Sequence, residues 1–252
     1  MLKQLFCVVA LVCTASFLSA QNVFDPSDTL ITYDGSSPAG TASNPGVPPN
    51  FIMSKWVRSS KMHWPTNNFK CYIWNGMQFR LRFPNNYNPA NPGKYPVIVF
   101  FHGGGEIGGV YDNEMQLVWG AQLFEQRINN GEWNGFLLFP QEPAIGWNDY
   151  HFSRINSVLD TLQKYNNTDP DRVIAMGLSA GGFGGLSYTS LYPQRVAVSI
   201  QASPVQVAAL TNTVNNWVHV PVWVANGGTD VNPDPASMQG FYTGVRNAGA
   251  DI

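Results

Sequence analysis

The chain has 252 residues, with 16 acidic and 14 basic side chains, a formal net charge of -2 and a charged fraction of only 12%. This length accommodates one domain with a buried sheet and does not demand two. So weak a charge provides no basic stripe of the kind that neutralises phosphates or anionic lipid heads, and we expect no nucleic-acid partner.

Residues 1–20 have the three zones of a secretory signal: a basic start at Lys3, an apolar run over residues 5–18, and small residues before Gln21. The run is shorter than the roughly 20 residues needed to span a bilayer, which disfavours the alternative of a lone transmembrane anchor. We therefore expect a cleaved signal peptide, a secreted or periplasmic protein, and no membrane span after cleavage.

Residues 25–50 are crowded with Pro, Gly, Ser and Asn. Such a composition cannot bury enough apolar surface to offset the entropy lost on ordering. We expect an N-terminal extension over residues 21–68, followed by one folded domain over residues 69–252.

Apolar and polar residues alternate over residues 69–83 around Asn75-Gly76. This pattern predicts an antiparallel hairpin, because Asn-Gly favours a two-residue turn. Cys71 lies in its first strand and is the only cysteine outside the signal. It can form no internal disulfide within this chain, and we interpret it as a small buried apolar residue.

After Pro96 the pattern changes to continuous apolar runs separated by helical segments, which is typical of a mostly parallel sheet in an α/β fold. The predicted strands are residues 97–101, 136–139, 173–176, 196–200 and 220–225. The predicted helices are residues 148–165, 180–192 and 237–248. The sequence shows no internal repeat, metal-ligand cluster or phosphate loop, and its four histidines are scattered.

The first of these strands ends in the turn His102-Gly103-Gly104-Gly105. Glycines allow backbone N–H groups to point into a pocket, where two donors can each stabilise developing negative charge by a few kcal/mol. A flexible loop would also explain the glycines, but not their position after a strand and upstream of the serine motif described next. We interpret His102 as a residue that shapes this turn.

The strand at residues 173–176 leads into Gly177-Leu178-Ser179-Ala180-Gly181, and a helix is predicted to begin at Ala180. The G-x-S-x-G pattern between strand and helix indicates a nucleophile elbow that exposes the Ser179 hydroxyl. The alternative is a glycine-rich turn with a solvated serine. If the elbow is correct, the N–H groups of Gly104, Gly105 and Ala180 form the oxyanion hole.

The strand at residues 220–225 is followed by a Gly-Gly loop and Asp230. An acid here would lie at the carboxyl edge of the sheet, where it could orient the imidazole of a Ser-His-Asp triad. The alternative is a surface turn residue, and Asp234 is a reserve candidate.

Over about residues 78–252 the chain resembles secreted α/β-hydrolase esterases related to polyhydroxybutyrate depolymerases, to feruloyl and acetyl-xylan esterases, and to a bacterial peptidase-phospholipase group. The motifs are Tyr95–Glu106, Phe139-Pro140-Gln141 with Trp147, Asp169–Val173, the serine elbow, and Pro221–Asp230. The resemblance implies an α/β-hydrolase fold, Ser179 and Asp230 as triad members, a backbone oxyanion hole, and neither cofactor nor metal.

The same resemblance implies an ester of an exported polymer as substrate, such as a decorated polysaccharide or a polyester, with Trp56, Trp64 and Trp74 as possible sugar platforms or ordinary core residues. Two alternatives stay open: a serine peptidase of the same fold, and a non-catalytic binding module.

One departure from the family pattern concerns the catalytic histidine, which follows the last strand in that family, whereas no histidine follows His219 here. His219 is predicted at the far end of its strand, about 20 Å from the catalytic edge. His151 is interpreted as a wall or packing residue. We therefore expect the domain to be C-terminally truncated in this sequence, with its histidine after Ile252.

Overall fold

The computed structural model describes residues 24–28, 61–108, 113–142, 144, 146–250 and 252. The predicted signal peptide, most of the predicted extension, Trp56 and Asp251 lie outside the described residues, so these predictions stay predictions. Among the described residues, no helix combines the length and apolarity that a bilayer crossing requires.

The predicted hairpin is present, with β1 (Phe69–Trp74) pairing antiparallel with β2 (Met77–Arg82). Asn75 and Gly76 both have positive φ, at 48° and 82°, as a tight turn between right-twisted strands requires. Cys71 is buried, as predicted, and its sulfur forms no disulfide among the described residues.

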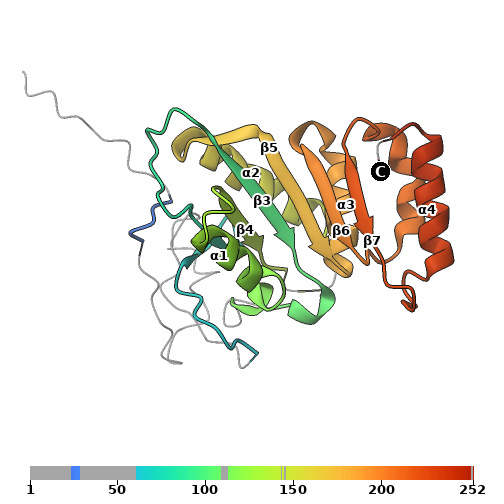
Figure 1. The fold of residues 1–252 in the computed structure, drawn as a ribbon, viewed down its shortest axis with the longest axis horizontal. Coiled ribbons are helices and arrows are strands. Elements are labelled where there is room, and N and C mark those ends of the chain that lie inside the picture. The colour runs from blue at the N-terminus through green and yellow to red at the C-terminus, as the bar shows by residue number, and fades with distance from the viewer. Residues whose placement is uncertain (1–23, 29–60, 109–112, 143, 145, 251) are drawn as a thin grey trace, which may run out of the picture.

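Seven strands form one sheet in the order β1-β2-β4-β3-β5-β6-β7. The last five in this order run parallel, and only β1 and β2 are antiparallel to their neighbours. The parallel strands are β3 (Tyr95–Phe101), β4 (Phe136–Pro140), β5 (Thr168–Leu178), β6 (Val198–Ala202) and β7 (Val222–Ala225). The predicted mostly parallel sheet is therefore confirmed, and its carboxyl ends share one edge (Figure 1).

The three predicted helices are also present, each within two residues of its predicted start. They are α2 (Asp149–Tyr165), α3 (Ala180–Leu191) and α4 (Pro235–Asn247). The Asn148 side chain caps α2 by accepting the N–H of Tyr150 at 3.0 Å. Two further helical segments, α1 (Ala121–Asn129) and the 3-10 segment η6 (Val207–Asn216), were not predicted from the sequence.

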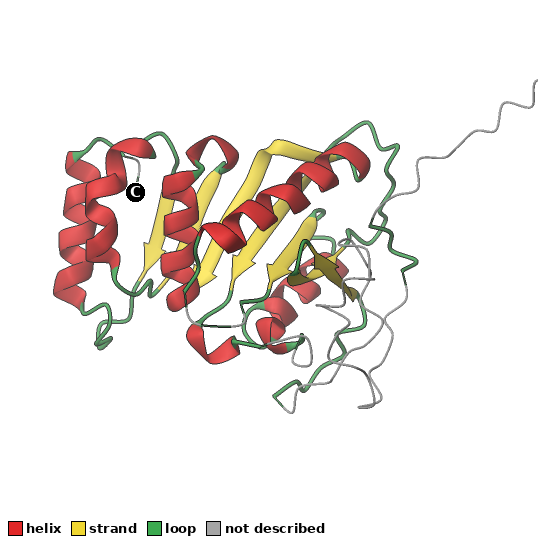
Figure 2. Cartoon of the chain, turned by 180° about the vertical axis from the view of Figure 1, so that it is seen from behind, coloured by secondary structure: helices red, strands yellow, loops and turns green. Residues whose placement is uncertain are grey.

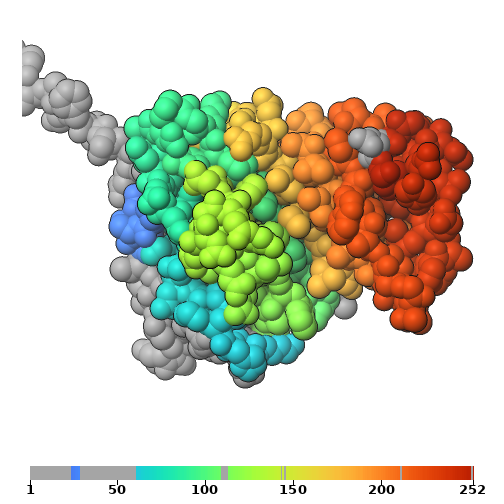
Figure 3. Space-filling model, in the orientation of Figure 1, coloured from blue at the N-terminus to red at the C-terminus, as the bar shows by residue number. Residues whose placement is uncertain are grey.

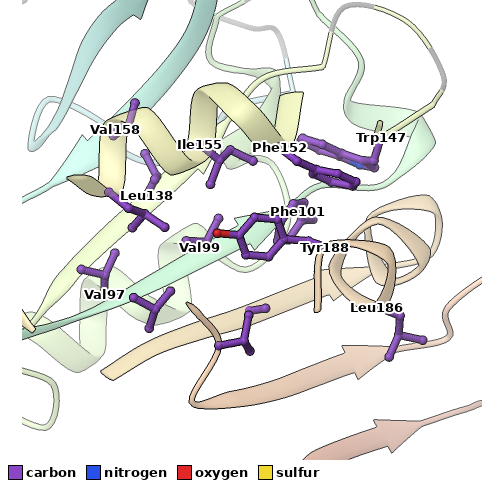
Figure 4. Packing of buried hydrophobic residues seen from close by; sticks show 14 of the residues in the cluster. Val97, Val99, Phe101, Leu138, Trp147, Phe152, Ile155, Val158, Leu186 and Tyr188 are labelled. Atoms are coloured by element: carbon purple, nitrogen blue, oxygen red, sulfur yellow. The ribbon is translucent and has the colours of Figure 1, made fainter. Parts of the chain in front are cut away.

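Helices cover both faces of the sheet (Figure 2). Val97, Val99 and Phe101 of β3 point to the face that α2 and α3 cover, while Ile98 and Phe100 point to the α1 face. Figure 4 shows the first of these two cores, where Phe101 meets Trp147 at a ring-centroid distance of 5.0 Å. A strand buried on both faces has a continuous apolar sequence, which is why β3 was recognisable.

Residues near the amino terminus contribute to the same core. Phe24 is 1% exposed and packs edge-on against Phe79, with ring centroids 5.6 Å apart. In Figure 3 this segment, coloured blue, lies at the opposite end of the molecule from α4, coloured red. Trp74 is buried in the same cluster, so of its two predicted alternatives it is a core residue, and Trp64 packs against Phe69.

Candidate active site

The serine elbow lies where β5 ends and α3 begins. Ser179 has φ 57° and ψ -120°, a strained conformation for a residue with a side chain. Its N–H donates to Ala202 O at 2.9 Å, and its carbonyl accepts the N–H of Phe183 at 3.1 Å. Ser179 is half-buried, so the bend presents its side chain at the carboxyl edge of the sheet rather than in the core.

Close backbone contacts explain both glycines of the motif. A methyl group on Gly177 would lie 2.2 Å from Gly181 O, and one on Gly181 would lie 2.0 Å from Phe101 O. No side chain fits at these distances, so both positions require glycine. The bend therefore depends on α3 starting directly against the end of β3.

A buried glutamine supports the elbow from within the sheet, and the sequence analysis missed it. Gln201 of β6 is fully buried and donates from Nε2 to Ala175 O at 3.0 Å and to Ser199 Oγ at 2.9 Å. A methyl group on Gly177 would also lie 2.8 Å from Gln201 Oε1. A glutamine inside a largely apolar strand was the available signal.

The triple-glycine turn lies beside the elbow. A methyl group on Gly103 would lie 3.5 Å from Ser179 Cβ, and one on Gly104 would lie 4.0 Å from Ala180 Cβ. Within the described residues, the N–H groups of Gly104, Gly105 and Ala180 donate no backbone hydrogen bond. These amides are therefore available to an acceptor atom beside Ser179.

His102 is occupied in holding this turn. It is 1% exposed; its Nδ1–H donates to Gly103 O at 2.8 Å, and its Nε2 accepts the N–H of Glu142 at 2.9 Å. These partners define the neutral tautomer, and burial lowers the pKa of His102 to about 4. Both ring nitrogens are therefore bonded to the protein, and His102 cannot act as the base for Ser179.

A carboxylate that the sequence analysis did not single out lies in the same turn. Glu106 is 5% exposed, and a methyl group on Gly103 would lie 2.8 Å from its Oε2. Burial raises the pKa of Glu106, while hydrogen bonds from the Trp119 side chain and the Gly103 backbone partly offset that rise. A charged residue directly after a run of glycines was the signal that could have found it.

Asp230 follows β7 and lies at the same edge of the sheet. Its Oδ2 accepts the Ser203 hydroxyl at 2.7 Å and the Gly227 N–H at 2.9 Å. Both bonds lower the pKa of Asp230, and the bond from Ser203 has the larger effect. Asp230 follows β7 and Ser179 follows β5, and only β6 lies between these two strands. The axes of β5 and β7 are therefore about 10 Å apart.

Asp234, the reserve acid, has a structural role instead. Its carboxylate caps α4, accepting the N–H groups of Ala236 at 2.9 Å and Ser237 at 3.0 Å. Both donors belong to the first turn of the helix, so the structure shows Asp234 in a capping role.

Among the described residues, no hydrogen bond joins any of the four histidines to Ser179 or Asp230. His151 is buried on α2 between Trp147 and Tyr150, at centroid distances of 5.5 and 5.2 Å. Among the described residues neither of its ring nitrogens has a hydrogen-bond partner. His219 lies ahead of β7, at the amino end of that strand, and His63 is exposed on the surface.

No protein-family model and no curated protein matches this chain. Solved structures do match. A thermostable esterase is 25% identical, with a TM-score of 0.58 over 70% of this chain and 49% of its own, so this chain spans about half that esterase's length.

Two further esterases share the arrangement. A ferulic acid esterase is 18% identical, with a TM-score of 0.55 over 69% of this chain and 81% of its own. Esterase 2 of Thermogutta terrifontis, phosphonylated by sarin, is 14% identical, with a TM-score of 0.54 over 77% of this chain and 84% of its own. Together with the sheet order and the helices on both faces, these likenesses show that this chain has the α/β-hydrolase fold.

Proposed function

We propose that this protein is a serine hydrolase that cleaves carboxylic esters through an acyl-enzyme on Ser179. The observation that carries the proposal is the strained strand-to-helix bend, which holds Ser179 beside the triple-glycine turn. A methyl group added to Gly103 would lie only 3.5 Å from Ser179 Cβ. A backbone strained at a non-glycine residue, with free amides beside it, is the arrangement that acyl transfer needs.

In the proposed reaction Ser179 Oγ attacks the ester carbonyl carbon and passes its proton to an imidazole base. The N–H groups of Gly104, Gly105 and Ala180 bind the oxygen that becomes negative. The alcohol leaves with the proton from the imidazole. Water then attacks the acyl carbon and passes a proton to the imidazole, and Ser179 Oγ leaves with a proton from the imidazole, which releases the acid. Asp230 would orient the imidazole through Oδ1, because Oδ2 already accepts two hydrogen bonds.

The base in this proposal is a further histidine, outside these 252 residues. Both ring nitrogens of His102 are bonded, and among the described residues none of the other three histidines forms a hydrogen bond with Ser179 or Asp230. A hollow of about 400 Å³ beside the acid loop, lined in part by Asn226, Gly227 and Gly228, offers space for an approaching segment. The loop that lines the hollow leads to Asp230, and this supports the assignment.

We further propose that the substrate is a polysaccharide-linked ester or a polyester and that the protein is secreted or periplasmic. The support is the predicted signal at residues 1–20 and the resemblance to polymer-degrading esterases. The likeness to a ferulic acid esterase agrees with this substrate class.

Labelling of the full-length protein with a fluorophosphonate tests the nucleophile, since a protein of this fold is phosphonylated by sarin. We expect one covalent adduct, lost in Ser179→Ala and retained in Ser153→Ala, a control on the exposed surface of α2. Absence of an adduct, or an adduct that persists in Ser179→Ala, would contradict the proposal.

A comparison of turnover on a 4-nitrophenyl acyl ester with turnover on an aminoacyl 4-nitroanilide separates the esterase from the peptidase alternative.

One observation favours a different function, a non-catalytic binding module: among the described residues, none of the four histidines forms a hydrogen bond with Ser179 or Asp230. A binding module would leave the fluorophosphonate unreacted and would hydrolyse neither chromogenic substrate. The same two measurements therefore decide between the alternatives.

A further inference from the structure

Ser203 is the first residue after β6, and it binds the neighbouring strand β7 and the loop that follows β7. Its N–H donates to Ala225 O, the last residue of β7, at 2.7 Å, and its hydroxyl donates to Asp230 Oδ2 at 2.7 Å. Both contacts are directed toward the strand and loop that carry the proposed catalytic acid.

The residue before it contacts the nucleophile. Ala202 accepts the N–H of Ser179 at 2.9 Å and is paired in register with Leu178 on one side and Ala225 on the other. The dipeptide Ala202-Ser203 therefore binds the backbone of the proposed nucleophile and the carboxylate of the proposed acid at the same time. Neither contact was foreseen from the sequence.

The backbone at Ser203 is strained, with φ at 42°. Asparagine and glycine adopt this region readily, whereas serine does so at a cost of about 1 kcal/mol or more. Ser203 donates both its N–H and its hydroxyl to the acid side of the site. A strained residue that uses its side chain at a candidate active site is a reason to suspect a role in function.

The carboxylate of Asp230 is fixed by this contact. With Ser203 Oγ–H and Gly227 N–H both on Oδ2, rotation of the carboxylate is restricted and Oδ1 is left for another donor. A methyl group on Gly227 would lie 2.9 Å from that same Oδ1, so the loop closes tightly around the acid. The hydroxyl of Ser203 is engaged as a donor and is not positioned as a second nucleophile.

We propose that Ser203 is a positioning residue, which holds Asp230 in the orientation that receives the imidazole and ties it to the elbow through Ala202. The inference rests on the proposed function, because it assumes that Asp230 is the triad acid. It predicts that the hydroxyl, and not the packing of residue 203, sustains the rate.

Ser203→Gly and Ser203→Thr in the full-length protein separate these two roles. Glycine removes the hydroxyl and relieves the positive φ, so we expect the melting temperature to hold or rise while kcat on a 4-nitrophenyl ester falls about 10- to 100-fold with KM little changed. Threonine keeps the hydroxyl but tolerates this backbone poorly, so we expect a lower melting temperature and a kcat close to that of the unmodified protein.

If Ser203 had only a structural role, kcat would follow the melting temperature. Ser203→Gly would then have the higher kcat and Ser203→Thr the lower one. Equal kcat in Ser203→Gly and the unmodified protein would overturn the inference, as would a threonine variant as slow as glycine. In an Asp230→Asn background, Ser203→Gly should cost no further rate, since the positioned carboxylate is already gone.

The variant Ser179→Ala distinguishes a failure of the proposed function from a failure of the role inferred for Ser203. If Ser179→Ala retains turnover and labelling, the nucleophile assignment itself is wrong, whatever residue 203 does. If Ser179→Ala is inactive while Ser203→Gly is unaffected, the hydrolase stands and only the role of Ser203 falls.

Discussion

Gly181 and Phe101 lie so close that a methyl group on the glycine would meet the phenylalanine carbonyl oxygen at 2.0 Å. The contact joins the first turn of α3 to the last residue of β3. The second glycine of the serine motif is thus required by a neighbouring strand as well as by the bend at Ser179.

Gly181→Ala should therefore destabilise the protein by about 3 kcal/mol or more, because backbone atoms would have to move apart. Gly240→Ala is the matched control, since Gly240 lies on the exposed side of α4 with nothing within 4 Å of the added methyl. We expect that control to gain about 0.5 to 1 kcal/mol from helix propensity. Chemical denaturation of both variants provides the measurement, and equal stabilities would show that the contact is not limiting.

His102 should make the protein sensitive to acid. Burial lowers its pKa from 6.5 to about 4, so the unfolded chain takes up a proton more readily than the folded one. This stability is fully present above pH 6.5 and is lost as the pH falls toward 4, by up to about 3 kcal/mol. His102→Gln should flatten that part of the curve of unfolding free energy against pH. An unchanged slope in the variant would show that His102 titrates normally.

Glu142 should have the opposite effect. It is fully buried, neither carboxylate oxygen has a well-formed hydrogen bond among the described residues, and burial raises its pKa from 4.5 to about 7. The stability contributed by its protonated form is fully present below pH 4.5 and is lost as the pH rises through 7.

Glu142→Gln should consequently be the more stable protein at pH 8, by about 2 kcal/mol, and should match the unmodified protein at pH 4. Unfolding free energies at the two pH values test this. Glu132→Gln, at a largely exposed position, is the control and should show little difference between them. A Glu142 variant that is less stable at both pH values would contradict the prediction.

Arg82 and Glu125 form a buried ion pair at 2.7 Å, with side chains 8% and 9% exposed. Arg82→Met should cost about 3 to 5 kcal/mol, because it leaves a buried carboxylate without its cation. Adding Glu125→Leu should recover much of that loss. The exposed pair of Arg195 and Asp160, with side chains 33% and 56% exposed, serves for comparison; Arg195→Met should cost under about 1 kcal/mol. Thermal and denaturant unfolding of the variants would measure these differences.

The elements predicted from the sequence were those with a strong local pattern. Asn75-Gly76 defined the hairpin, and the apolar runs defined the parallel strands, with boundaries shifted by a few residues at β5 and β6. α1 begins after Gly120, which has a φ of 83°, and carries no conventional side-chain cap, so its start had no signal in the sequence. η6 is an extended 3-10 segment, a conformation that no periodic pattern marks.

The candidate site was predicted in part for the same reason. Ser179, the triple-glycine turn and Asp230 each follow a recognisable strand, and the parallel topology brings all three to one edge. Gln201 and Ser203 were missed because their roles depend on partners in other strands and loops, and Glu106 was missed because its burial depends on how its turn packs.

By itself, the sequence determined the α/β class and the strand-to-helix position of Ser179, because hydrophobic period and glycine spacing act over a few neighbouring residues. Only the tertiary structure decided that His102 is a neutral part of the turn and that Asp230 is held by Ser203. Each of these depends on hydrogen bonds and desolvation that exist once the strand ends and their loops pack against one another, and no local pattern encodes them.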